Sequence, residues 1–517
     1  MQSKDSIRLV LPLQFDHPEW GGNITHEESR LLTFWDTFEW GLWLVGRLLY
    51  SCEGVYHLCT HEGGWIGEEL SRESSAARRQ FWGDFTTPAM RGALEEPLGL
   101  RGLAPVVEGI FHRSQGELRN KMGKIVCRVE WTAVAPCKQR GDILFQACRI
   151  TPLLGYESEA TRLVEKLSLA GAKPVGDGPL GALLGNSNLS PHRYTLRPEF
   201  GLRQETPARE AMGVIVRSML TLALSNVPGI IRDLDTEFLH DYRICFRKIR
   251  SGLSLIKEVY PPHETLRLRE IFGDLARQTN RLRDLDVYLL ARDEYLGMLP
   301  PGFRQGMEGM FKDFAAERGT EVRRVTSKLR GAPWRRLHQE VAEYFAPESV
   351  HGPSPAADLP IGPLAFRRIH KRYQLIRKLA AEIGAETPDE AVHQLRIQCK
   401  KLRYLMEFFA ELIPPEEGAI LLKLLRRLQG KLGEFNDASV QQHSLLSYWA
   451  GKKSGCEAAL GLGGLVSLLY HKQQQSRLLI HQAMDGFCDG ATAATFKRIF
   501  KQPVAVHPTA ATRSEQP

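Results

Sequence analysis

The chain has 517 residues, of which 43% are hydrophobic and 25% are charged, proportions that are ordinary for a globular protein and exclude global disorder. At roughly 100–200 residues per domain, this length predicts two or three domains. The sequence has no run of about 18 apolar residues and no secretory signal, so we expect neither a membrane-spanning helix nor export. Nine cysteines without a repeating spacing indicate reduced thiols.

The positive charge is unevenly distributed along the chain. Residues 1–204 contain 23 Lys and Arg against 24 Asp and Glu, whereas the remainder contains 45 against 36, so the formal net charge of +8 arises from the C-terminal part. This asymmetry indicates an anionic partner there: a nucleic acid, an anionic membrane surface or a phosphate polymer. A basic surface that only keeps the protein soluble is the alternative.

The first 200 residues are typical of an antiparallel β domain. Short apolar runs alternate with turn residues, and they predict strands at 7–11, 42–50, 106–111, 125–131 and 143–150. An amphipathic stretch predicts a helix at 157–169, and the Gly-, Pro-, Ser- and Asn-rich segment 171–200 is interpreted as the domain end and a linker. From about 205 to 500, apolar residues recur at three- and four-residue spacing, which predicts long helices.

The helical region contains one pattern twice. Residues 239–250 (LHDYRICFRKIR) correspond to residues 392–403 (VHQLRIQCKKLR), with His240 aligned to His393 at an offset of 153. Downstream, Asp284 and Asp437 match at the same offset without a gap. Two motifs that match at one offset predict a duplicated unit with pseudo-two-fold symmetry.

On a helix, the basic residues of each motif form a stripe. At 100° per residue, Arg243, Arg247 and Arg250 lie within about 80° of His240, and the second copy repeats the stripe beside the apolar face. Because stacked cations repel each other, either internal carboxylates or an external polyanion must offset them. Asp284 and Asp437 are candidates for the internal role, with helix capping or an arginine pair as the ordinary use of such aspartates.

The repeated motif resembles the CHAD family (conserved histidine α-helical domain), over residues 205–500. This resemblance implies two four-helix bundles with a basic central channel that binds inorganic polyphosphate without catalysis. By position, the implied contacts are His240, Arg243, Arg247, Lys248, Arg250, His393, Arg396, Lys400, Lys401, Arg403 and Tyr404, with Arg281, Arg427 and Lys431 from neighbouring helices.

Residues 1–200 resemble the CYTH family, whose fold is an antiparallel β tunnel that binds triphosphate with basic residues and holds a metal with glutamates. The segments 34–37 and 41–47 carry the resemblance, but Arg8, Val10 and Pro12 stand where the family has two acids and a lysine. The strand at 143–150 also lacks carboxylates, so we expect a catalytically inactive tunnel without metal. Arg47, Arg113 and Arg149 are candidates for phosphate contacts. The alternative is that they are ordinary surface arginines of the strands.

Together these patterns predict an α+β multidomain protein. We expect a degenerate CYTH-like domain at 1–200, helical repeats at 205–346 and 364–502, a Pro-rich linker at 347–363 and a disordered tail at 503–517. The expected function is non-enzymatic polyphosphate binding in the cytoplasm of a bacterium, at polyphosphate granules, without a cofactor or a membrane; homo-oligomerisation is left open. One alternative is a divergent triphosphatase that uses Glu108, Glu117 and Glu130; the other is nucleic-acid binding, which is disfavoured because only Tyr404 could stack on a base.

One further motif is assigned no function. The run Gly-Leu-Gly-Gly-Leu at 461–465 follows no predicted strand, so it is not a dinucleotide-binding fingerprint.

Overall fold

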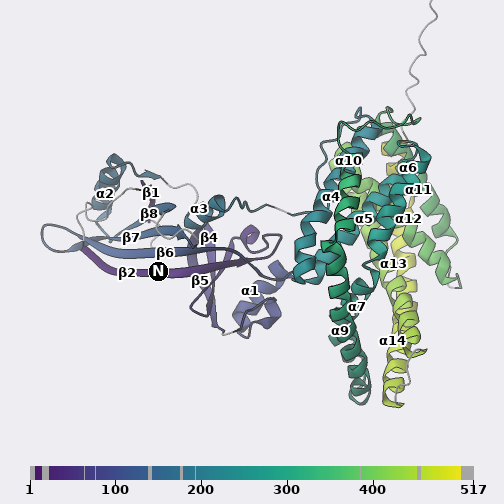
Figure 1. Ribbon diagram of the computed structural model, residues 1–517, viewed down its shortest axis with the longest axis horizontal. Coiled ribbons are helices and arrows are strands. Elements are labelled where there is room, and N and C mark those ends of the chain that lie inside the picture. Colours follow the sequence, from purple (N-terminus) through teal and green to yellow (C-terminus); the bar gives the residue numbers. More distant parts are fainter. Residues whose placement is uncertain are drawn as a thin grey trace, which may run out of the picture. The chain divides into compact units, whose positions relative to one another are not determined.

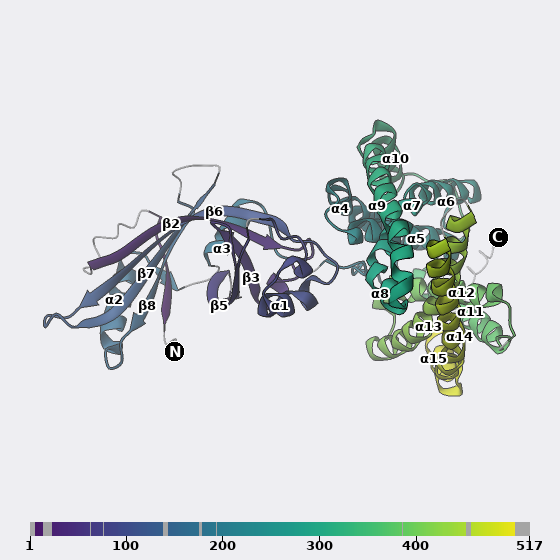
Figure 2. The ribbon, with the colours of Figure 1, turned by 90° about the horizontal axis from the view of Figure 1, so that it is seen from below.

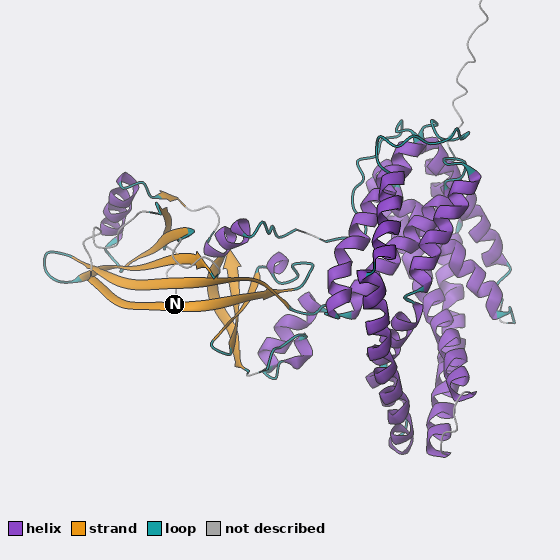
Figure 3. Ribbon diagram, viewed as in Figure 1, coloured by secondary structure: helices purple, strands orange, loops and turns teal. Residues whose placement is uncertain are grey.

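The computed structural model describes residues 6–13, 23–62, 64–75, 77–137, 143–174, 178–192, 194–384, 386–450 and 456–501. The chain divides into two compact units, Met1–Tyr194 and Thr195–Pro517, and each is described by itself. Strands dominate the first unit and helices the second, so the predicted α+β class is confirmed (Figure 3). The predicted disordered tail at 503–517 lies outside the described residues.

The N-terminal unit is built on one nine-stranded antiparallel sheet with the order β5-β4-β3-β2-β6-β7-β8-β1-β9. Its strands and helices are β1 (Ile7–Leu11), β2 (Asn23–Asp36), β3 (Arg47–Cys52), β4 (Val55–Glu62), β5 (Trp65–Ser74), α1 (Pro88–Leu98), β6 (Ala104–Arg119), β7 (Ile125–Pro136), β8 (Phe145–Pro152), α2 (Glu157–Leu169), β9 (Lys173–Pro174) and α3 (Pro179–Asn186). The predicted helix at 157–169 is α2, with the same bounds.

The sheet curls on itself. Arg8 of β1 forms a 3.3 Å ion pair with Glu62 of β4, although five strands separate β1 from β4 in the sheet order. The guanidinium of Arg8 also lies 5.6 Å from the ring centre of Trp65, at the start of β5. This curled, β-rich domain is consistent with the CYTH-like tunnel that the sequence predicted.

Two of the element predictions for this unit need correction. The segment 42–50 is not one strand: a 3-10 turn (Trp43–Val45) ends at Gly46, whose φ of +72° suits glycine, and only then does β3 begin. The segment 171–200 is not only a linker, because α3 places Leu180, Leu183 and Leu184 in the hydrophobic core. A Cβ at Gly109 of β6 would lie 2.6 Å from the Leu183 side chain, so that glycine lets α3 approach the sheet.

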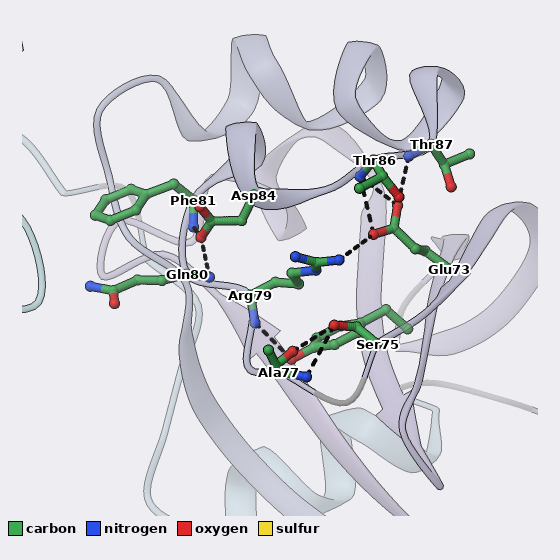
Figure 4. A network of polar contacts seen from close by, with 10 residues as sticks. Glu73, Ser75, Ala77, Arg79, Gln80, Phe81, Asp84, Thr86 and Thr87 are labelled. Carbon is green, nitrogen blue, oxygen red and sulfur yellow. Dashed lines mark hydrogen bonds and ion pairs between the residues drawn. The ribbon is translucent and has the colours of Figure 1, made fainter.

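The end of β5 is tied to α1 through one buried carboxylate. Glu73 accepts hydrogen bonds from the backbone N–H groups of Thr86 and Thr87, at the N-terminus of α1, and Arg79 donates to the same carboxylate at 3.0 Å (Figure 4). Burial alone would raise the pKa of Glu73, but the bonds from Thr87 and Thr86 outweigh it and lower the pKa. The carboxylate therefore serves the fold, as an anion at a helix N-terminus does.

In the described residues of the C-terminal unit, helices are the main regular structure. Its helices are α4 (Ala208–Arg232), α5 (Thr236–Leu255), α6 (Pro262–Arg277), α7 (Asn280–Leu290), α8 (Arg292–Met298), α9 (Pro301–Arg330), α10 (Ala332–Tyr344), α11 (Ile361–Ala381), α12 (Asp389–Phe408), α13 (Pro415–Ala450), α14 (Cys456–Cys488) and α15 (Gly490–Phe500). By length and composition α4 could cross a membrane, but half of its most apolar window is buried within this unit.

The helix boundaries repeat at the offset of 153 that the motifs gave. Both ends of α5 recur in α12 at this offset, and the starts of α4 and α6 recur in α11 and α13. Equivalent helices also contact each other: α4 with α11, α5 with α12, and α9 with α14. Helices α5 and α12 lie side by side in two views (Figures 1 and 2).

The segments that precede α4 and α11 are exchanged between the repeats. Pro207 and Pro360, which are equivalent residues, form an antiparallel bridge. On one side of it, the N–H of Ala208 donates to the carbonyl of Leu359 at 2.9 Å; on the other, the N–H of Ile361 donates to the carbonyl of Thr206 at 2.9 Å. These reciprocal bonds support the predicted pseudo-two-fold relation, while the division into two four-helix bundles stays a prediction. The segment 347–363 is thus packed on the repeats.

The glycines of the unassigned motif lie at a helix crossing. A Cβ at Gly461 of α14 would lie 2.7 Å from the Phe303 carbonyl oxygen of α9, and one at Gly306 of α9 would lie 2.3 Å from the Glu457 carbonyl oxygen of α14. Near the crossing, a hydrophobic cluster joins the two repeats, with Phe311 and Phe314 of α9 packed beside Leu465 and Leu469 of α14. The motif therefore permits close packing of two backbones.

Candidate functional site

Helices α5 and α12 present the two copies of the basic motif. Asp235 caps the N-terminus of α5 by accepting hydrogen bonds from the N–H groups of Glu237 and Phe238 at 2.9 and 3.2 Å. The apolar face of each motif is buried, at Tyr242, Phe246 and Ile249 in α5 and at Leu395, Cys399 and Leu402 in α12. Burial of these faces fixes the orientation of the basic stripes beside them.

Cations from both repeats meet between α5 and α12. Burial, and then the positive charges of Arg396 and Arg247, lower the pKa of Lys400 to about 8. Burial and the charge of Arg247 likewise lower the pKa of Arg243 to about 10. Arg247 belongs to the first repeat and Arg396 and Lys400 to the second, so the two stripes face each other. We call Arg243, Arg247, Arg396, Lys400 and Arg403 the basic cluster.

The basic cluster has hydrogen-bond donors without acceptors. The Nε atoms of Arg247, Arg396 and Arg403 are buried and make no hydrogen bond with the described residues. Lys400 makes no hydrogen bond or ion pair within the described part of the chain. Buried donors normally have acceptors, because an unsatisfied one costs free energy. An anion would supply acceptors and opposite charge together.

Two aspartates of the chain itself offset part of this charge. Arg396 donates to Asp437 at 3.1 Å. Burial raises the pKa of Asp284, although Arg243 and Arg281 act in the opposite direction. Both aspartates lie inside helices, so neither caps a helix; Asp437 is a hydrogen-bond partner of Arg396, whereas Asp284 acts on Arg243 and Arg281 only through its charge.

The two repeats hold their first motif arginine differently. Arg243 donates to the carbonyl oxygen of Ala276 at 2.7 Å and to Thr279 Oγ1 at 2.8 Å. Both acceptors lie where the helical structure is interrupted between α6 and α7. In the second repeat α13 continues through the equivalent position, and its backbone carbonyls are engaged within the helix. Arg396 therefore donates to the Asp437 carboxylate instead.

The motif histidines lie at the edge of the stripes. His393 is exposed, and its Nδ1 forms a 2.5 Å hydrogen bond with Oδ1 of Asn436. His240 is half-buried at the equivalent position of α5. Among the described residues no group of three or more His, Cys, Asp or Glu side chains could hold a metal ion.

A second group of cations surrounds Glu407 of α12, which is buried. Lys248 Nζ lies 2.9 Å from one carboxylate oxygen and Arg403 Nε 3.7 Å from the other. Arg197 Nε lies 3.1 Å from that second oxygen, as an ion pair without hydrogen-bond geometry. Lys248 is thus engaged inside the protein, by a carboxylate that Arg403 of the basic cluster also approaches. The sequence patterns missed Arg197 and Glu407, because Arg197 falls in the presumed linker and Glu407 lies beyond the motif.

Some of the remaining predicted residues form a third cationic group, and the others lie outside all three groups. Arg250 lies over Gly273 and, after the effect of burial, its pKa is lowered by Arg269 and Arg277. Burial, Arg372 and Arg269 lower the pKa of Lys401. The others do not join these groups: Arg281 pairs with Glu317, Lys431 pairs with Glu434, Arg427 is exposed, and Tyr404 is buried with Arg403 5.5 Å from its ring centre.

The predicted arginines of the N-terminal unit have partners. Arg47 donates to the Ala93 carbonyl, and Arg113 pairs with Glu130 at 3.1 Å. Burial lowers the pKa of Arg149. Arg113, Glu130 and Arg149 line a space of only about 20 Å³, which holds about one water molecule.

The three candidate acids of the N-terminal unit are dispersed. Glu108 accepts from Thr33, and Glu117 pairs with Arg119. At about 3.3 Å per residue, Glu108 and Glu117 stand roughly 30 Å apart along β6. Glu130 is engaged with Arg113. The three carboxylates therefore do not converge on one point.

Comparison with known families agrees with this geometry. Residues 214–446, which include both basic motifs, match the family described as CHAD domain. The helical unit contains a CHAD domain. The match begins after Arg197, so that residue lies outside the matched part of the chain.

The chain is also similar to curated proteins and solved structures. Two Mycobacterium tuberculosis proteins, uncharacterized protein MT2285 (strain CDC 1551 / Oshkosh) and uncharacterized protein Rv2226 (strain ATCC 25618 / H37Rv), are each 26% identical over 289 residues. That match covers 55% of this chain, and the chain spans about half, 53%, of the length of these relatives.

Two solved structures resemble the chain at low identity. The CHAD domain from the plant Ricinus communis is 21% identical, with a TM-score of 0.46, over 57% of this chain and 97% of that one. PptA from Streptomyces chartreusis is 18% identical, with a TM-score of 0.42, over 54% of this chain and 100% of that one.

Proposed function

We propose that the CHAD domain binds inorganic polyphosphate at the basic cluster and that it does so without catalysis. The observation that carries the proposal is the meeting of Arg247 from the first repeat with Arg396 and Lys400 from the second. Bringing like charges together in a partly buried place costs free energy, which a bound polyanion would recover. A CHAD domain, by its family, implies polyphosphate as that polyanion.

The mixture of side chains suits a linear phosphate polymer. An arginine can donate two parallel hydrogen bonds to one phosphate, while a lysine acts as a point charge that tolerates a shifting chain. The cationic group of Arg250, Arg269, Arg277, Arg372 and Lys401 involves both repeats as well. It would extend the path of a polymer beyond the basic cluster.

The geometry gives less support to the two alternatives. A nucleic-acid site would use exposed aromatic rings for base stacking, and Tyr404 is buried with a side-chain partner of its own. A triphosphatase would need Glu108, Glu117 and Glu130 to converge, and they do not. We extend the proposal to a location in the bacterial cytoplasm at polyphosphate granules.

The test is titration of the full chain with long-chain polyphosphate at 50 and 200 mM salt, with RNA as competitor. We expect tight binding that falls steeply with salt, because each neutralised phosphate releases counterions, and that RNA displaces poorly. Equal displacement by RNA, or an affinity independent of salt, would overturn the proposal.

A pair of double variants locates the site. Arg396→Gln/Lys400→Gln should lower the affinity by at least about a hundredfold, at roughly 1.5–3 kcal/mol for each charged contact. The control is Arg367→Gln/Lys371→Gln on α11, which removes the same residue types at the same spacing from an exposed face. An equal loss in both would show attraction by net charge alone.

A further inference from the structure

The first repeat has a pocket of about 390 Å³ that is separate from the basic cluster. Its floor is one face of α4, where Arg209, Gly213 and Arg217 follow each other at four-residue spacing. Tyr260 and the segment from Phe345 to His351 form its walls. The volume falls in the range of about 300–1,000 Å³ that is typical of small-molecule sites.

The walls combine fixed guanidinium groups with aromatic rings. Arg209 Nη2 donates to the carbonyl of Gly352 at 2.8 Å, and Arg217 Nη1 donates to the carbonyl of Phe345, so both side chains are held in place. The ring of Tyr260 lies 5.5 Å from that of Phe345 and 5.3 Å from that of His351. Tyr260 and Phe345 are almost fully buried, so the accessible apolar surface of the pocket comes from residues such as Val214 and Ala346, which are half-buried.

The acidic side chains that line the pocket lie where it meets solvent. Glu210 and Asp358 are among the lining residues and both are exposed, whereas Arg209 and Arg217 are half-buried. Carboxylates in solvent are well screened, so the less accessible part of the pocket carries the positive charge. The N-terminus of α4 adds no donors, because the N–H groups of Ala208 and Arg209 already bond to Leu359 and Ala357.

Comparison with the second repeat shows which features of the pocket the fold of a repeat does not require. At the offset of 153, Arg209 corresponds to Gly362, Gly213 to Phe366, Arg217 to His370 and Tyr260 to Ile413. Phe366 is buried and its ring lies 5.3 Å from that of Phe500. A large side chain thus occupies, in one repeat, the position that glycine leaves open in the other. Packing of the repeat demands neither the pocket nor its arginines.

We propose that this pocket binds a small organic anion. A carboxylate or phosphate head group would accept hydrogen bonds from Arg209 and Arg217, and an apolar body would pack against the half-buried Val214 and Ala346. The site is independent of the polyphosphate site, because neither arginine belongs to any of the cationic groups around α5 and α12.

The test uses three fluorinated probes of one size with the full chain: 4-fluorobenzoate, 4-fluorophenyl phosphate and neutral 4-fluorobenzyl alcohol. Dissociation constants are measured by ¹⁹F NMR titration. We expect at least one of the two anions to bind about tenfold or more tightly than the alcohol, and the preferred anion identifies the head group. No binding by either anion, or equal binding by the alcohol, would overturn the proposal.

Variants locate the binding. Gly213→Phe, which copies the second repeat, should abolish binding of the preferred anion, and Arg217→Gln should weaken it about tenfold without changing the affinity of the alcohol. His370→Gln, at the position equivalent to Arg217, is the control and should change nothing. If Gly213→Phe does not fold, as judged by circular dichroism, Arg217→Gln decides alone. Saturating polyphosphate should leave anion binding unchanged, and displacement by it would assign the probe to the basic cluster.

Discussion

Lys248 of α5 and Glu407 of α12 form an ion pair that joins the two repeats, with 2.9 Å between Nζ and a carboxylate oxygen. Their side chains are only 5% and 4% exposed, so both charges have left water and each depends on the other. Arg197 pairs with the same carboxylate. One glutamate therefore holds α5, α12 and the segment before α4 together.

Removal of this carboxylate charge should destabilise the helical unit. We expect Glu407→Gln to lower the free energy of unfolding by about 3–5 kcal/mol, because it leaves Lys248 charged and buried with only the Leu196 carbonyl oxygen as an acceptor. The double variant Lys248→Met/Glu407→Gln should recover a large part of that loss. Urea unfolding followed by circular dichroism measures both values. A loss below about 1 kcal/mol in the single variant would show that the pair contributes little.

We expect Lys400 to destabilise the unbound protein and to strengthen the binding of polyphosphate. Each unit of pKa shift corresponds to about 1.4 kcal/mol, so we expect Lys400→Met to stabilise the unbound chain by roughly 1–3 kcal/mol at pH 7 and to weaken polyphosphate binding. Lys371→Met on the exposed face of α11 is the control, with changes within about 0.5 kcal/mol. Thermal unfolding and titration on the same samples provide the comparison. Unchanged stability in Lys400→Met would contradict the crowding of charges at this site.

The depressed pKa of Lys400 also predicts a pH dependence. Above pH 8 the folded protein loses this charge, so the affinity for polyphosphate should fall between pH 7 and 9, and Lys400→Arg should flatten the fall. Stability of the unbound protein should change in the opposite direction. Between pH 8 and about 10.5 the unfolded chain still binds the proton that the folded chain has released, so this group's contribution makes folding more favourable as pH rises. Titrations and unfolding curves at four pH values would reveal a wrong sign in either.

The crossing of α9 and α14 gives a matched pair of glycine variants. Gly306→Ala would place a Cβ 2.3 Å from the Glu457 carbonyl oxygen, so the helices must move apart, and we expect a loss of about 1–3 kcal/mol. Gly309 on the same helix has open space around it, so Gly309→Ala should stabilise the protein by about 0.5–1 kcal/mol through helix propensity. Urea unfolding distinguishes the two, and equal effects would exclude a close crossing.

Much of the helical unit could be predicted from sequence, because its signals are local and repeated. The offset of 153 between His240 and His393 is also the offset between the ends of α5 and of α12. The 100° periodicity separated the buried residue Phe246 from Arg247 on the stripe. The β domain was harder to predict. Strand β2 is mostly exposed and polar over its first half, and it pairs with the distant β6, so no apolar run marked it.

The residues of the candidate site show the same contrast between local patterns, which sequence reveals, and long-range contacts, which it does not. Helical spacing was enough to select Arg243, Arg247, Arg396 and Lys400, since one turn of helix fixes their relation. It also selected Lys248, whose partner Glu407 lies on another helix and could not be inferred from periodicity. Arg197 and the pocket above α4 depend on contacts between segments more than 100 residues apart, which no local pattern records.

The exchanged bonds on either side of Pro207 and Pro360 have a consequence for how such a molecule is assembled. A single repeat folded alone would leave the first N–H groups of its leading helix without the carbonyls that the other repeat supplies. Two separate copies could satisfy each other in the same way, as a symmetric dimer with swapped arms whose formation depends on concentration. Joining them in one polypeptide removes that dependence. It also allows the two repeats to differ in sequence, as they do where Gly213 of the first corresponds to Phe366 of the second.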